Sequence, residues 1–331
     1  SADFQGQMVH PQHWPANLDY AGKRVVVIGS GATAITLVPT MADKAAHVTM
    51  LQRSPSYVAS LPSQDKIANT LRRWLPLQWA YLLTRWKNVL LGMAFYNGAR
   101  RFPNAFSRFI RAGVNAALQS RELVKAHFTP SYKPWDQRLC MVPDGDLFRV
   151  IRSGRAEVVT DQIDTFTRTG IRLQSGREIA ADIVVTATGL DLLVMGGIAL
   201  HVDGKPVVMG EHITYKGMML NDIPNMAFVI GYTNASWTLK ADLVSEYVCR
   251  LLQHMQQSGQ RQCTPRFNDP RITTQHWIDF TSGYIQRALH KFPMQGNKIP
   301  WGLHQNYARD VYNLRYGSLR DGAMEFSNHT P

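Results

Sequence analysis

The run Arg24–Gly29 and the turn after it constrain the fold more than any other part of the sequence. A short apolar stretch closed by glycine is typical of a buried parallel strand, and residues 32–42 have the pattern of a helix. Between them lies Gly29-Ser30-Gly31-Ala32-Thr33-Ala34, which spells GxGxxA. With a second expected strand at 46–52, the segment indicates a βαβ unit of the dinucleotide-binding type.

Each small residue of this turn has a physical reason in a dinucleotide site. Gly29 permits the tight turn, Gly31 lets the backbone approach a pyrophosphate, and Ala34 allows the helix to pack closely on the strand. The helix that follows directs free N–H groups and the positive end of its dipole towards the phosphates. We therefore expect the residues of the turn to bind a cofactor: Gly29, Ser30, Gly31, Ala32, Thr33 and Ala34.

The end of the second strand bears on the choice between NAD and NADP. An acidic residue there would bind the ribose 2′-hydroxyl, but the sequence has Gln52-Arg53-Ser54. Arg53 can form a bidentate pair with a 2′-phosphate, and the hydroxyl of Ser54 can donate another hydrogen bond. These residues predict NADPH; the alternative is that Arg53 is only a surface charge at a strand end.

The rest of the chain follows a changing pattern. Residues 1–20 look irregular, and 66–126 look mostly helical. Short β-type runs are expected at 157–160, 163–168, 170–173 and 183–188, a buried strand at 226–231 and a helix at 236–255. The aromatic-rich tail from about residue 260 has little periodicity, and we expect it to wrap the surface. A chain of 331 residues has room for two domains or one large α/β domain.

Positive charge is concentrated in the helical segment. Between Lys66 and Lys125 there are eleven basic residues and one acid, Glu122, a net +10 of the chain's +12. One apolar face of three- and four-residue steps accompanies them: Trp79, Leu82, Leu83, Trp86, Val89, Leu90 and Met93. Either a helical pair packs on a core with solvated arginines outside, or the segment makes peripheral contact with an anionic membrane. A nucleic-acid partner is not expected, because no recognised binding module occurs.

Cysteine usage and hydropathy exclude other classes of protein. The three cysteines are Cys140, Cys249 and Cys263, and no CxxC occurs, so neither a metal site nor a dithiol centre is indicated. Reduced thiols fit a cytoplasmic protein, which could lie peripherally on the inner face of the membrane. The sequence contains no run of 18 apolar residues, so a transmembrane helix is not expected.

The first fifteen residues carry a second motif. Phe4, Gly6, His10 and Trp14 spell FxGxxxHxxxW ahead of the glycine turn, and Ala187-Thr188-Gly189 ends an apolar strand later in the chain. In this order the three landmarks resemble the type I Baeyer–Villiger flavin monooxygenases. Four further segments look similar to the ethionamide-activating subgroup: 10–15, 132–145, 215–220 and 231–243.

The resemblance implies an FAD- and NADPH-dependent monooxygenase that uses O2. Through a C4a-peroxide of the flavin, such enzymes insert oxygen into ketones to give esters or lactones, and they oxidise thioether or thioamide sulfur. A first alternative is the related class that oxidises amines and sulfides, although its members usually have Phe or Tyr where Trp14 stands. An alternative of another class is an inactive NADP-binding or membrane-associated fragment.

The resemblance also assigns roles to residues. It makes Arg138 in PWDQRL the catalytic cation; the alternative is an ion pair with Asp136 or Asp144. Gln137 stands where the family often has Lys, which leaves more of the 2′-phosphate to Arg53.

The remaining assignments concern domain coupling and the flavin. The resemblance makes the fingerprint Phe4, Gly6, His10 and Trp14 a linker that couples two domains. It places further residues near flavin or nicotinamide: Thr188, Gly189, Asn234, Trp237 and Thr238. Ser236 is the expected N-cap of the helix that follows.

The implied architecture is α/β with three parts. A linker at 1–20 precedes a Rossmann-like NADPH domain at 21–189 with a helical insertion at about 66–126. Residues 190–331 form the C-terminal half of a second Rossmann-like, FAD-binding domain with the wrapping tail. Because no GxGxxG precedes Phe4, the first FAD-binding unit is expected to be absent from this chain. The chain alone is then expected to bind FAD poorly and to be inactive.

Overall fold

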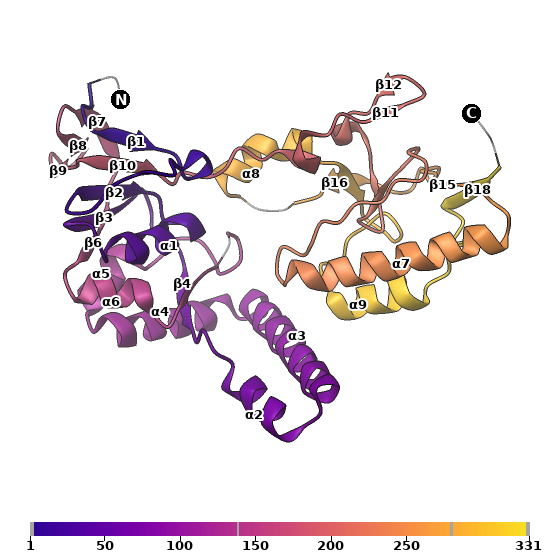
Figure 1. Cartoon of the computed structure of the whole chain (residues 1–331), viewed down its shortest axis with the longest axis horizontal. Coiled ribbons are helices and arrows are strands. Elements are labelled where there is room, and N and C mark those ends of the chain that lie inside the picture. Colours follow the sequence, from indigo (N-terminus) through magenta and orange to yellow (C-terminus); the bar gives the residue numbers. More distant parts are fainter. Residues whose placement is uncertain (1–2, 138, 279–280, 329–331) are drawn as a thin grey trace. The chain divides into compact units, whose positions relative to one another are not determined.

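A computed structural model describes residues 3–137, 139–278 and 281–328. The chain divides into two compact units, whose elements are labelled in Figure 1. Unit 1 comprises Ser1–Thr84 and Phe95–Leu190, and unit 2 comprises Arg85–Ala94 and Asp191–Pro331.

Unit 1 is built on a parallel five-stranded sheet. Its strand order is β1-β10-β2-β3-β6, with β1 at Gln7–Val9, β10 at Ile183–Thr186, β2 at Arg24–Ile28, β3 at His47–Gln52 and β6 at Ala156–Thr160. Helix α1 (Ala32–Met41) connects β2 to β3, which confirms the predicted βαβ unit. At the start of β2, Arg24 pairs with Asp182 at 2.7 Å and lowers the pKa of that carboxyl to about 2.

Alternate residues of the strands enter two different cores. Val25 and Val27 of β2 pack with α1 and with α4 (Pro103–Leu118), α5 (Arg121–His127) and α6 (Asp146–Arg152). Val26 packs on the other face, against an antiparallel sheet of β7 (Ile163–Thr167), β8 (Gly170–Leu173) and β9 (Glu178–Ala180). Because both faces are covered, the central strands β2 and β10 are mainly apolar, as expected for a parallel sheet.

The expected helical segment consists of α2 (Lys66–Trp74), α3 (Leu77–Arg101), α4 and α5. Before it, β4 (Val58–Leu61) pairs in parallel with β5 (Cys140–Pro143). The side chain of Asp65 accepts a hydrogen bond from the backbone N–H of Ala68 and caps α2.

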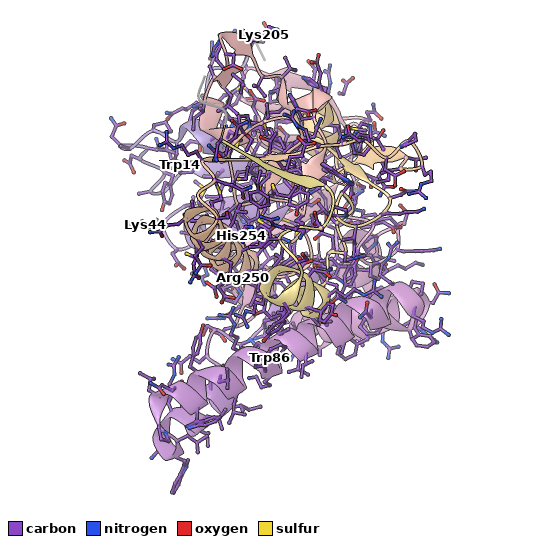
Figure 2. The ribbon with its side chains drawn as sticks, turned by 90° about the vertical axis from the view of Figure 1, so that its right-hand side faces the viewer. Trp14, Lys44, Trp86, Lys205, Arg250 and His254 are labelled. Atoms are coloured by element: carbon purple, nitrogen blue, oxygen red, sulfur yellow. The ribbon has the colours of Figure 1, made fainter. Side chains whose placement is uncertain are left out.

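The single apolar face expected on α3 is only partly packed. Val89 is buried in the core of unit 2, where Trp86 and Met93 pack against it, and Figure 2 shows Trp86 on the side of α3 that faces α9. The other four members of the face remain exposed: Trp79, Leu82, Leu83 and Leu90. A 25-residue helix is about 37 Å long, and periodicity alone does not show which of its turns meet a core.

Unit 2 surrounds the long helix α7 (Trp237–Gln257), which confirms the predicted helix. Its strands form two-stranded antiparallel pairs: β11 (His201–Val202) with β12 (Lys205–Pro206), β13 (Thr214–Tyr215) with β14 (Met219–Leu220), β15 (Gln262–Pro265) with β18 (Met324–Ser327), and β16 (Thr274–His276) with β17 (Met294–Gly296). Shorter helices are α8 (Gly283–Ala288) and α9 (Tyr307–Val311).

Two expectations for this part of the chain were wrong. Residues 226–231 are irregular rather than a buried strand, and Val229 is exposed there. The tail does not merely wrap the surface, because Trp301, Tyr307 and Leu314 enter the core around α7. A short apolar run has the same composition in a loop as in a strand, so its lack of a pairing partner could not be read from the sequence.

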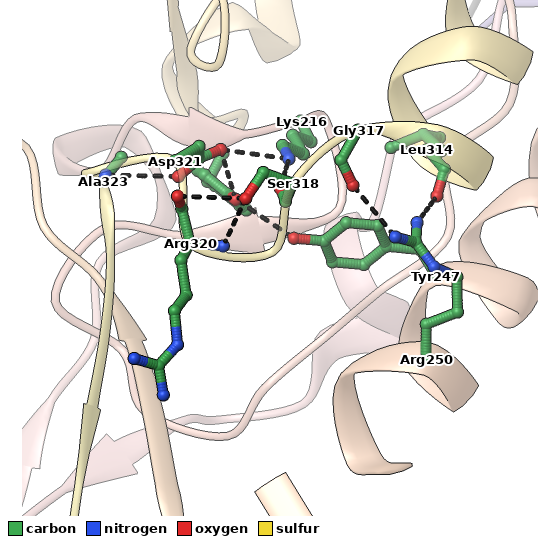
Figure 3. A network of polar contacts seen from close by, with 10 residues as sticks. Lys216, Tyr247, Arg250, Leu314, Gly317, Ser318, Arg320, Asp321 and Ala323 are labelled. Carbon is green, nitrogen blue, oxygen red and sulfur yellow. Dashed lines mark hydrogen bonds and ion pairs between the residues drawn. The ribbon is translucent and has the colours of Figure 1, made fainter. Parts of the chain in front are cut away.

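A buried polar network joins the tail to α7 (Figure 3). The ammonium group of Lys216 lies 3.0 Å from Oδ2 of Asp321, and the hydroxyl of Tyr215 donates to the same oxygen at 2.8 Å. The hydroxyl oxygens of Tyr215 and Tyr247 are 3.1 Å apart. Burial lowers the pKa of Lys216, and the charge of Asp321 opposes that shift.

From the next turn of α7, Arg250 bonds to the same tail. Its guanidinium donates to the carbonyl oxygens of Leu314 and Gly317, at 2.6 and 2.9 Å. These charge-assisted bonds satisfy carbonyl groups at the end of a helical turn (Figure 3). The C-terminal segment is therefore an integral part of unit 2.

Candidate functional site

The predicted cofactor residues of unit 1 meet at one edge of the parallel sheet. Parallel strands all end on the same side, and this edge is where open α/β sheets bind ligands. Gly29 directly follows β2 and Arg53 directly follows β3, while β10 leads to Thr188 and Gly189. His10 directly follows β1, so the start of the chain reaches the same edge.

Gly29 is required by the geometry of the turn. Its φ of +133° is a backbone angle that residues other than glycine rarely adopt. A Cβ atom at this position would lie 2.3 Å from the carbonyl oxygen of Ala187. The backbone N–H of Gly29 donates to the oxygen of Leu51 at 2.8 Å. The first glycine of the motif therefore joins three neighbouring strands.

Gly31 differs, because the space in front of it is open. No heavy atom lies within 4 Å of a Cβ atom built there. Gly31 is the N-cap of α1 and forms no side-chain cap, and Ala32 beside it is exposed. Ala34, in contrast, is fully buried against the sheet. The first turn of α1 therefore presents uncapped N–H groups to an open space, the arrangement that suits a pyrophosphate.

A serine cluster connects the glycine turn to the segment after β3. Ser30 Oγ lies 2.7 Å from Ser56 Oγ and donates to the carbonyl oxygen of Ser54 at 3.3 Å. The side chains of Arg53 and Ser54 are exposed beside this link, and Thr33 is half-buried. Ser56 was not among the predicted residues, because it belongs to no motif and only the folded turn brings it to Ser30.

The fingerprint is more ordered than the irregular linker expected. Residues 7–9 form β1, the edge strand of the sheet, paired in parallel with β10. Gly6 precedes it so closely that a Cβ would lie 2.5 Å from the carbonyl oxygen of Asp182. The ring of Phe4 packs against Phe166 with 6.5 Å between centroids. Phe4 and Gly6 thus allow β1 to pack closely against the rest of unit 1.

His10 binds the start of the chain to the end of β10. Its Nε2 lies 3.1 Å from the carbonyl oxygen of Gly189, and its Nδ1 accepts from the backbone N–H of Gln12 at 3.2 Å. These bonds select the neutral tautomer with the proton on Nε2. The φ of Gly189 is +111°, in the region that favours glycine. Trp14, the last residue of the fingerprint, is 37% exposed. The hydrogen bond from His10 therefore couples two segments 179 residues apart.

Arg138, predicted as the catalytic residue, lies outside the described residues. The carboxylates considered as its alternative partners have other contacts. Asp136 forms an ion pair with Arg100 at 3.1 Å. Asp144 accepts a hydrogen bond from the backbone N–H of Ser63 at 3.0 Å, and hydrogen bonds from Ser63 lower the pKa of that carboxyl.

The remaining predicted residues lie before and within the first turn of α7 in unit 2. The side-chain amide of Asn234 donates to the carbonyl oxygen of Gln305 at 2.9 Å. Ser236 occupies the N-cap position but forms no cap, since its Oγ lies 2.8 Å from Oγ1 of Thr238. Trp237 is 54% exposed. This 21-residue helix therefore begins with an exposed, uncapped turn, which suits an electron-rich acceptor.

Metal and membrane signals are absent from the described ranges. No cluster of His, Cys, Asp and Glu among those residues could hold a metal ion. In the same part of the chain, no helix is both long and apolar enough to cross a bilayer.

A parallel sheet with an open glycine turn at its carboxyl edge defines the class of dinucleotide-binding α/β proteins. Solved structures of that class share the fold of this chain. Oxidized steroid monooxygenase bound to NADP matches with a TM-score of 0.66 at 18% identity, over 99% of this chain and 71% of its own. Cyclohexanone-bound cyclohexanone monooxygenase in the Rotated conformation matches with 0.64 at 19% identity, over 98% and 71%.

Curated relatives identify the family. FAD-containing monooxygenase EthA of Mycobacterium tuberculosis (strain ATCC 25618 / H37Rv) is 52% identical over 328 residues, which are 99% of this chain and 67% of the relative. A probable FAD-binding monooxygenase AlmA from Acinetobacter baylyi (strain ATCC 33305 / BD413 / ADP1) is 48% identical, over 99% of this chain and 66% of its own. No protein-family model matches. The chain belongs to the FAD-containing monooxygenase family, which confirms the family predicted from the fingerprint.

Proposed function

We propose that the chain contributes the NADPH site and part of the FAD site of a monooxygenase that inserts one oxygen atom from O2 into ketones and oxidises sulfur compounds. The observation that carries this proposal is the open, uncapped start of α1 at Gly31. FAD-containing relatives support it, as do fold neighbours that bind NADP or cyclohexanone. Membership of the family makes a small organic molecule and O2 the substrates.

NADPH would occupy the carboxyl edge of the sheet in unit 1. The N–H groups at the start of α1 would bind the pyrophosphate, and the guanidinium of Arg53 with the hydroxyl of Ser54 would bind the 2′-phosphate. Residues 188–189 would border the same cofactor, while His10 holds the carbonyl of Gly189 in place. We infer that Phe4, Gly6, His10 and Trp14 couple the motion of this unit to the rest of the enzyme.

FAD would lie against the uncapped start of α7, near Asn234, Trp237 and Thr238. When bound, it supplies the redox chemistry that NADPH and O2 require. The dipole of a 21-residue helix favours negative charge at this end, which suits the reduced flavin. We propose the linker at 1–20, the NADPH domain at 21–189 and the FAD-binding part at 190–331 as the functional divisions.

Product analysis tests the proposed reaction. With NADPH, O2 and a cyclic ketone, the FAD-loaded enzyme should form the lactone, and NADH should support the reaction at least about tenfold more slowly because it lacks the 2′-phosphate. A tertiary amine serves as the comparison substrate. N-oxide formation without any lactone would favour the amine-oxidising class and overturn the proposal.

We propose a second function for a surface of α2 and α3, peripheral contact with an anionic membrane. We define the α2–α3 apolar surface as Trp74, Leu75, Leu77, Trp79, Leu82 and Leu83. Trp74 is 81% exposed and Leu77 is 75% exposed, although such side chains are normally packed. Arg72 and Arg73 lie in the last turn of α2, directly before this surface. Exposed tryptophan and leucine beside arginine match a lipid interface with acidic headgroups.

Vesicle binding tests this second function. Wild-type protein should sediment with vesicles of phosphatidylglycerol and phosphatidylcholine at low salt, and added salt should weaken that binding. Replacing Trp74 and Leu77 by Ser should reduce partitioning at least about tenfold, since each buried side chain contributes about 1.5–3 kcal/mol. Leu193→Ser, at a 69% exposed position elsewhere, is the matched control. Absence of binding at low salt would overturn the proposed membrane contact.

A further inference from the structure

A buried ion pair lies directly behind the start of α7. The ammonium group of Lys240 is 2.8 Å from Oδ2 of Asp310, and their side chains are only 5% and 12% exposed. The hydroxyl of Tyr232 donates to the same carboxylate oxygen at 2.7 Å. Burial and the nearby carboxylate raise the pKa of Tyr232, so the phenol stays protonated and remains a donor. A lysine this deeply buried is uncommon and needs such partners.

The position of Lys240 makes the pair unusual. Lys240 is the fourth residue of α7, where the positive end of the helix dipole disfavours a cation. Asp310, from α9, compensates that charge. The first turn of α7 therefore has an uncapped N-terminus on its exposed side. On its buried side it has a Lys–Asp ion pair whose net charge is zero.

The loop before α7 is tied to the segment that carries Asp310. The side-chain carbonyl of Gln305 accepts from the backbone N–H of Thr233 at 3.0 Å and from its hydroxyl at 3.3 Å. The backbone carbonyl of Gln305 accepts from Asn234. A small cavity borders Tyr232, Lys240, Gln305 and Asp310. Residues 305–310 thus hold both the loop and the first turn of the helix.

We propose that Lys240 and Asp310 are positioning residues for FAD: they orient the loop 232–236 and keep the first turn of α7 electrostatically balanced where it meets the pyrimidine edge of the isoalloxazine. This rests on the proposed function, in which the flavin lies at this helix end. Removal of either charge leaves a single buried charge near the ring. The affinity for reduced, anionic flavin then changes relative to the oxidised form, and the sign depends on which charge remains.

The experiment measures the two-electron reduction potential and the affinity of FAD in the full holoprotein. Asp310→Asn leaves the cation and should favour the reduced flavin at least tenfold, a shift of about +30 mV. Lys240→Met leaves the carboxylate and should shift the potential about as far in the negative direction. The double variant Lys240→Met/Asp310→Asn should return close to the wild-type potential.

The second buried pair of unit 2 provides a matched control. Lys216 and Asp321 have the same chemistry (Figure 3), but their network meets α7 at Tyr247, seven residues further along the helix, about 10 Å away along its axis. Asp321→Asn should therefore lower stability without shifting the potential.

The outcomes separate this inference from the proposed function. Shifts of equal sign in both single variants, or an equal shift in Asp321→Asn, overturn the positioning role and leave only a structural one. If Asp310→Asn does not fold, Lys240→Met and the double variant carry the test, and equal potentials in those two overturn it. A full-length wild-type protein, with its complete FAD-binding domain, that binds no FAD would instead refute the proposed function itself.

Discussion

A methyl group at residue 31 should weaken NADPH binding about 100-fold and leave the fold intact. Gly31→Ala places its Cβ in open space, and the backbone there, at φ −81° and ψ −176°, is allowed for alanine. The unfolding free energy should therefore change by under about 1 kcal/mol. The pyrophosphate would have to occupy the same space, so we expect the Kd for NADPH to rise about 100-fold. Titration calorimetry and thermal unfolding measure the two effects.

Gly29→Ala and Gly113→Ala provide the comparisons. At Gly29 the φ of +133° and the 2.3 Å approach to Ala187 predict destabilisation by about 2–4 kcal/mol, and NADPH binding is lost with the fold. Gly113 has open space around it within α4, so alanine there should stabilise by about 1 kcal/mol and leave NADPH binding unchanged. Tight NADPH binding by Gly31→Ala would remove the start of α1 from the phosphate site.

The elements of unit 1 could be predicted because local patterns determine them. The apolar run of β2, the glycines after it and the period of α1 are all consecutive in sequence. The motif also predicted a tight turn at Gly29 and open space for a pyrophosphate at Gly31. It did not indicate β1, because a three-residue edge strand has too short a pattern and depends on a partner, β10, near residue 183.

Unit 2 was less predictable because its contacts are long-range. Helix α7 has a clear period, but residues 226–231 have the composition of a buried strand and no strand partner. Gln305 and Asp310 hold the start of α7 from positions about 70 residues later. No spacing rule links them to Asn234 or Lys240, and buried polar partners of this kind are recognised only once the fold brings them together.

Arg138→Ala should uncouple NADPH oxidation from oxygen transfer in the FAD-loaded enzyme. Arg stays charged in any protein environment, and a fixed cation stabilises negative charge that develops during oxygen transfer. Flavin reduction by NADPH needs no such group, so anaerobic stopped-flow should give a rate within about threefold of wild type. Aerobic product formation should fall about 100- to 1,000-fold, and the NADPH consumed should appear as hydrogen peroxide.

Two variants distinguish this role from a general loss of positive charge. Arg138→Lys keeps the charge but not the planar guanidinium, so we expect partial coupling, between wild type and Arg138→Ala. Arg172→Ala removes an exposed arginine that pairs with Asp164 in the β7–β8 hairpin, and coupling should be unchanged. Normal product yield from Arg138→Ala would assign the stabilising charge to another group. A loss of flavin reduction in that variant would instead indicate that Arg138 binds NADPH. The neighbouring Gln137 cannot form an ion pair with the 2′-phosphate, because an amide carries no charge.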